Sequence, residues 1–85
     1  MQPKWIERAR DTARFHRMKC LEDDKWTLAK TARSLRRSIG SVCEDLKIVS
    51  WLKTHEKQLE GFKYCYEARE FIRKKEKELA LSDYE

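Results

Sequence analysis

Glycine and proline are scarce in this sequence, with 2 Gly and 1 Pro among 85 residues, whereas Lys, Arg, Asp and Glu together make up 41%. A chain that has few turn-forming residues and is rich in Lys, Arg and Glu favours helices over strands. Its length also excludes a two-domain enzyme, a TIM barrel and a full dinucleotide-binding fold. We therefore expect a single all-α domain over residues 1–85.

Long apolar runs and closely spaced cysteines are also missing. No stretch approaches the roughly 18 apolar residues that indicate a transmembrane helix, and the N-terminus has no signal-peptide core. The three cysteines, Cys20, Cys43 and Cys65, form no CxxC pair, so a disulfide framework is not indicated. We therefore expect a cytoplasmic protein with no membrane partner.

Sequence motifs that carry catalysis are absent as well. There is no Gly-rich phosphate loop and no nucleophile elbow, and a chain of 85 residues encloses a substrate poorly. His16 and Cys20 lie one helical turn apart and could form half of a zinc site that Cys43, Cys65 or His55 would complete. Both also fall on an apolar stripe, which favours packing in the core over metal binding. We expect no enzyme, cofactor, metal or small-molecule substrate.

Apolar side chains recur at helical spacing near both ends of the chain. The first predicted helix lies within residues 1–24, and its apolar stripe consists of Trp5, Ile6, Ala9, Ala13, His16 and Cys20. Phe15 and Met18 lie outside this stripe. The last predicted helix runs from Phe62 to about Leu81, and one face of it carries Tyr64, Cys65, Ala68, Phe71, Ile72, Lys75 and Leu79. Both helices have apolar surface to spare, which indicates a second copy of the chain, so we expect a homodimer.

Shorter helices are predicted between these two. Thr27 is suited to cap a helix over Leu28–Leu35, and Ser38 is suited to cap a helix that continues to Val49 or Ser50. The segment 54–61 is expected to form a turn or another short helix. The predicted architecture is a compact bundle of four to five helices, divided into an N-terminal helix, a middle region and a C-terminal helical region that is a candidate for dimerisation, over residues 1–24, 25–53 and 54–85.

Positive charge is concentrated in the middle region. Residues 25–53 carry seven Lys or Arg side chains and two acidic ones, a net charge of +5, which equals the formal net charge of the whole chain. The N-terminal and C-terminal regions carry net charges of only +1 and −1. A local excess of this kind is typical of a surface that binds a polyanion, and a chance cluster on a solvated face is the alternative.

The same region has the spacing of a helix-turn-helix, in the segment 31–46. Ala32 is small enough to let two helices approach closely, and Leu35 and Val42 are placed to fill the space between them. Ser38 is placed to satisfy free amides at the start of the second helix.

On these residues the sequence resembles the helix-turn-helix family, over about residues 27–50, and most of all the type in ParB/KorB partition proteins and small phage-encoded proteins, where Ala, Leu, Ser and Val recur at this spacing. Three residues depart from that pattern. Arg36 stands where glycine is usual, so the turn can differ in backbone conformation. Thr31 and Asp45 stand where apolar residues are usual, and Leu46 is expected to take the place of Asp45.

The resemblance implies that the second helix of the motif enters the major groove of DNA with its N-terminal residues toward the base edges. On its outer side would lie Ser38, Gly40, Ser41, Glu44 and Lys47. Of these, Glu44 could accept a hydrogen bond from cytosine, and Ser41 could bond a base or a phosphate. The phosphate-binding residues would be Arg36, Arg37, Arg33 and Lys30. In the alternative interpretation, Glu44 and Asp45 repel DNA or pair with Arg37 and Lys47.

The function implied by the resemblance is sequence-specific binding of double-stranded DNA, by a small phage or plasmid transcriptional regulator that acts as a dimer. One alternative is a DNA-binding subunit of a phage packaging, partition or replication complex. Another is a helical protein–protein adaptor that does not bind DNA.

Overall fold

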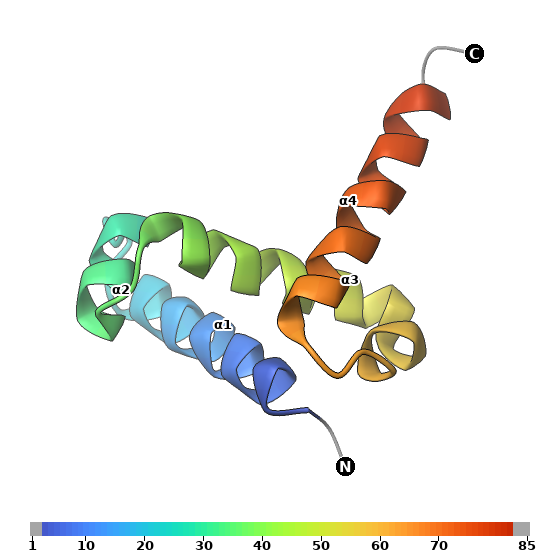
Figure 1. Cartoon of the computed structure of the whole chain (residues 1–85). Helices are drawn as coiled ribbons and strands as arrows, with labels where there is room; N and C mark the ends of the chain where they lie inside the picture. The colour runs from blue at the N-terminus through green and yellow to red at the C-terminus, as the bar shows by residue number, and fades with distance from the viewer. Residues whose placement is uncertain (1–2, 83–85) are drawn as a thin grey trace.

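The fold is all-helical in a computed structural model that describes residues 3–82 (Figure 1). The described residues form four helices and no strand, namely α1 (Lys4–Glu22), α2 (Leu28–Leu35), α3 (Ile39–Glu60) and α4 (Cys65–Ser82). The expectation of an all-α bundle of four to five helices is confirmed.

The starts of α2 and α3 are set by the two predicted caps. The Thr27 side chain accepts a hydrogen bond from the Lys30 backbone N–H at 3.3 Å, and the Ser38 side chain accepts one from the Ser41 N–H at 3.1 Å. Each cap satisfies an amide that has no partner within its helix. The predicted bounds of α2 agree with those observed.

Helix α3 is longer than expected. It extends to Glu60, and only His55 leaves the helical conformation, with φ −129° and ψ 32°. Residues 56–60 form a short helical segment beyond the kink at His55, which agrees with the turn or short helix expected over 54–61. The hydroxyl of Thr54 lies 2.7 Å from His55 Nδ1 at this kink.

The predicted start of the last helix at Phe62 is wrong, because α4 begins at Cys65. Two contacts hold the preceding residues in a loop. Trp5 Nε1–H donates to the Phe62 carbonyl oxygen at 3.1 Å, and the Tyr64 N–H donates to the Glu67 carboxylate at 3.1 Å. The second contact is the reciprocal half of a capping box, so it favours a helix that starts directly after Tyr64.

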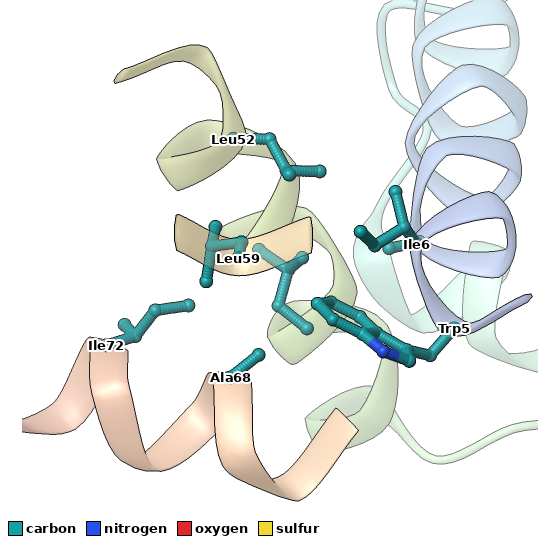
Figure 2. Packing of buried hydrophobic residues seen from close by; sticks show 8 residues of the cluster. Trp5, Ile6, Leu52, Leu59, Ala68 and Ile72 are labelled. Atoms are coloured by element: carbon teal, nitrogen blue, oxygen red, sulfur yellow. The ribbon is translucent and has the colours of Figure 1, made fainter. Parts of the chain in front are cut away.

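The helices pack around one apolar core. Helix α1 lies along α3 in the opposite direction, α2 closes one end of this pair, and α4 crosses α3 and then points away from the other helices (Figure 1). Side chains from α1, α3 and α4 meet in the cluster of Figure 2, whose buried members are Trp5, Ile6, Ala9, Ile48, Leu52, Leu59, Ala68 and Ile72. Full burial of an Ile or Leu side chain stabilises the fold by about 1.5–3 kcal/mol relative to exposure.

The predicted apolar faces of the terminal helices are only partly buried. In α1 the stripe is buried up to Ala9, half-buried at His16 and exposed at Cys20, so the expected core position of Cys20 is wrong. The reason is that the short helix α2 reaches α1 at His16, whose Nδ1 lies 2.7 Å from Thr31 Oγ1. In α4 the stripe ends in Leu79, which is 60% exposed because this part of the helix extends beyond the core.

Candidate nucleic-acid interface

Helices α2 and α3 form a helix-turn-helix with the predicted close contact between them. Ala32 and Val42 are buried, at 3% and 0% exposure, and Leu35 is half-buried. The turn is held by a hydrogen bond of 2.9 Å from the Arg37 N–H to the Ala32 carbonyl oxygen. Arg36 adopts the left-handed conformation, with φ 56° and ψ 45°. Glycine adopts this conformation most readily, so Arg36 leaves the turn with the backbone that a glycine would favour.

The two polar residues at usually apolar positions are both buried. Thr31 is 0% exposed and Asp45 is 1% exposed, whereas Leu46 is half-buried. The expectation that Leu46 takes the place of Asp45 is therefore wrong. A carboxylate tolerates such a position only where charge and hydrogen bonds compensate for lost hydration.

Asp45 finds this compensation in Arg37 and in helix α1. Its Oδ2 lies 2.7 Å from Arg37 Nη1 and 3.0 Å from the Thr12 hydroxyl, and its Oδ1 lies 3.5 Å from Arg8 Nη2. Arg37 Nη1 also donates to the Thr12 hydroxyl at 2.8 Å, and Arg37 Nε donates to the Ser41 hydroxyl at 3.2 Å. Arg37 thus pairs with Asp45, as the alternative interpretation expected, and it joins the turn, α1 and α3.

Thr31 is satisfied by a second set of contacts. Trp26 Nε1–H donates to the Thr31 hydroxyl at 2.7 Å, and His16 Nδ1 lies 2.7 Å from the same oxygen. Among the described residues, no buried side-chain nitrogen or oxygen lacks a hydrogen-bond partner. The two polar residues at usually apolar positions, Asp45 and Thr31, therefore both hydrogen-bond to side chains of α1, and Thr31 also bonds Trp26 before α2.

Two further predicted DNA contacts are neutralised by α4. Glu44 pairs with Arg69 at 2.9 Å, and Lys47 pairs with Glu76 at 3.2 Å. An open groove of about 410 Å³ lies between α3 and α4, and both Glu44 and Lys47 line it. These ion pairs were not predicted, because Arg69 and Glu76 lie 25 and 29 residues away from their partners in the sequence.

The remaining predicted site residues, apart from Lys30, lie where α2 ends and α3 begins, and we call this surface the α2–α3 tip. All of its members are exposed, namely Arg33, Arg36, Ser38, Ile39 and Gly40. Lys30 is also exposed, but it lies in the first turn of α2, at the other end of that helix. Within residues 3–82, the Arg33 and Arg36 side chains have no ion-pair or hydrogen-bond partner, and Lys30 has only the Trp26 ring, 5.8 Å from its Nζ. The sequence from residue 25 to residue 43 contains no acidic residue. The tip therefore carries positive charge that the described chain does not neutralise.

Ile39 is the tip residue that the sequence reasoning missed. It was not among the predicted contacts, but its side chain is 50% exposed in the first turn of α3. Its position between the predicted contacts Ser38 and Gly40 was the available signal, since the N-terminal residues of the second helix of such a motif face the base edges. Of the nine predicted contacts, four are thus engaged within the chain, namely Arg37, Ser41, Glu44 and Lys47. Four others lie on the tip with Ile39, and the ninth, Lys30, lies at the start of α2.

Other candidate sites are not assembled. Cys20 Sγ lies 3.5 Å from His16 Nε2, but within residues 3–82 no group of three or more His, Cys, Asp or Glu side chains could hold a metal ion. In the same part of the chain, no helix is both long enough and apolar enough to cross a membrane. Comparisons of the chain with protein-family models, with curated proteins and with solved structures found no match.

Proposed function

We propose that the chain binds double-stranded DNA through the α2–α3 tip. The observation that carries this proposal is the unneutralised charge of Arg33 and Arg36 beside the exposed first turn of α3. Of the other charged groups of the motif, Asp45 is neutralised by Arg37, Glu44 by Arg69 and Lys47 by Glu76. Lys30 has no ion-pair partner in the described chain. Phosphates supply the negative charge that this surface lacks, and such contacts dominate the affinity of proteins for DNA.

The backbone of the tip supports the same proposal. The start of a helix presents amide groups without partners and a partial positive charge, and in helix-turn-helix proteins it is the part that enters the major groove. Here the first turn of α3 is exposed at Ser38, Ile39 and Gly40. Helix α4 lies farther along α3, at Glu44 and Lys47, so it leaves the first turn accessible.

The biological role that we favour is that of a cytoplasmic transcriptional regulator. A single helix-turn-helix contacts few base pairs, so a two-fold dimer that reads two half-sites would supply the affinity for an operator. Native mass spectrometry separates this role from a packaging role, because a regulator of this kind would be a dimer and a packaging subunit would form a larger ring.

The proposal is tested by the salt dependence of DNA binding. Fluorescence anisotropy with a labelled random-sequence duplex, measured over a series of salt concentrations, gives the slope of log affinity against log salt. We expect Arg33→Ala and Arg36→Ala each to weaken binding and to reduce the slope by about 1, as for the loss of one phosphate contact.

Lys57→Ala is the matched control. Lys57 is exposed, lies near the opposite end of α3 and has no ion-pair partner within the described chain. Its removal changes the net charge by the same amount as each arginine substitution, but it should leave the slope unchanged. Equal effects of all three substitutions, or an affinity that does not respond to salt, would contradict the proposed interface.

A further inference from the structure

Ile39 and Gly40 are adjacent residues that the isolated fold does not require. The Ile39 side chain is 50% exposed and lies outside the buried core. A Cβ added to Gly40 would meet nothing within 4 Å, and its φ is not positive, so alanine would fit there. Glycine destabilises a helix relative to alanine, and an exposed isoleucine gains little from folding. A contact outside the chain would account for both residues.

The chemistry of the tip narrows the choice of that contact. In the major groove the one apolar group on the base edges is the 5-methyl group of thymine. We propose that Ile39 contacts this methyl group, and that Gly40 lets the first turn of α3 approach the base edges closely. This inference rests on the proposed function, and it assigns to Ile39 a preference for thymine at one position of the site.

A protein partner would require a different surface. Protein–protein interfaces have a contiguous apolar centre, whereas the other exposed residues of the tip are Arg33, Arg36, Ser38 and Gly40. The other large apolar side chains that are at least half exposed in the described chain lie on or next to α1 and α4, namely Met18, Leu21, Tyr64, Tyr66 and Leu79. A single apolar side chain among unneutralised cations fits a methyl group that is flanked by phosphates.

The test removes the methyl group from the DNA and the side chain from the protein. A duplex selected from a random pool by the wild-type chain is remade with each thymine replaced in turn by deoxyuridine, which keeps the base pair and lacks only the methyl group. We expect about fourfold weaker binding at one or two thymine positions, as for the loss of one buried methyl group. With Ile39→Ala, the thymine and deoxyuridine duplexes should bind equally.

Two variants serve as controls. Ile39→Val keeps an apolar branch and should retain part of the discrimination, and Leu21→Ala, at a site that is 80% exposed on α1, should retain all of it. Thermal unfolding of Ile39→Ala should match the wild type. The inference is overturned if no thymine is sensitive, or if the sensitivity persists in Ile39→Ala. A chain that binds no duplex at all would refute the proposed function, and binding without thymine sensitivity would refute this inference alone.

Discussion

Replacing Asp45 by alanine removes the acid that neutralises Arg37 inside the fold. The Asp45 carboxylate is 1% exposed and lies 2.7 Å from Arg37 Nη1, and the Arg37 side chain is 19% exposed. In Asp45→Ala the guanidinium would keep its hydrogen bonds to Thr12 and Ser41 but would lose its one ion-pair partner among residues 3–82. An unpaired charge at such a site is strongly destabilising.

The expected cost is large for a protein of this size. Removal of one partner of a buried ion pair costs about 3–5 kcal/mol. A chain of 85 residues has a total free energy of unfolding of roughly 4–13 kcal/mol at typical values per residue. Asp45→Ala should therefore remove a large part of the stability and lower Tm by roughly 12–40 °C.

Urea unfolding followed by tryptophan fluorescence measures this cost, and the chain contains three tryptophans as probes. Arg8→Ala is the matched control, because Arg8 contacts the same carboxylate at 3.5 Å from a side chain that is 55% exposed. We expect it to cost less than about 1 kcal/mol. The double variant of Asp45→Ala and Arg37→Ala should cost less than the sum of the single variants, by about 1–3 kcal/mol.

The reasoning would be refuted by either of two results. The first is a cost for Asp45→Ala no larger than that for Arg8→Ala, which would mean that Asp45 carries no unusual energetic role. The second is strict additivity of Asp45→Ala and Arg37→Ala, because two side chains in direct contact should show coupling.

Two further predictions concern the tip and the second buried polar residue. Gly40→Ala should raise the free energy of unfolding by about 0.5–1 kcal/mol and should weaken duplex binding. Thermal melts measure the first effect and fluorescence anisotropy measures the second. Stronger binding would contradict the close approach of this turn to DNA. Thr31→Val should lower the free energy of unfolding by about 1–3 kcal/mol, because Trp26 Nε1–H and His16 lose their shared partner. Urea unfolding measures this loss. A loss near zero would show that solvent replaces the hydroxyl.

The starts of α2 and α3 could be predicted, because their caps, Thr27 and Ser38, each act within a few consecutive residues. Each side chain bonds an amide three residues ahead, so the signal is contained in the local sequence. The start of α4 at Cys65 was missed, although the cap between Tyr64 and Glu67 is equally local, because the loop before it also depends on a distant contact. The loop at Phe62 is held by Trp5, 57 residues away, and no local pattern reports such a contact.

In the candidate site, too, some properties follow from the local sequence and others depend on contacts between distant residues. The basic character of Lys30, Arg33 and Arg36 follows from composition, because no acid occurs between residues 25 and 43. The neutralisation of Glu44 and Lys47 depends on where α4 crosses α3, and that crossing is set by the packing of Ala68 and Ile72 in the core. The cations of the motif can therefore be read from the sequence, whereas the tertiary structure decides which of them have an acidic partner among the described residues.

Local patterns determined the helical class, the motif over α2 and α3, and the concentration of positive charge in the middle region. These depend on residues close together in the chain, whose spacing and capping chemistry act before any tertiary contact forms. The packing of α1 and α4 against α3 decided which polar residues are buried, which charges are paired and that Ile39 is exposed. Burial and pairing depend on distances between side chains from different helices, and those distances are set only when the core is assembled.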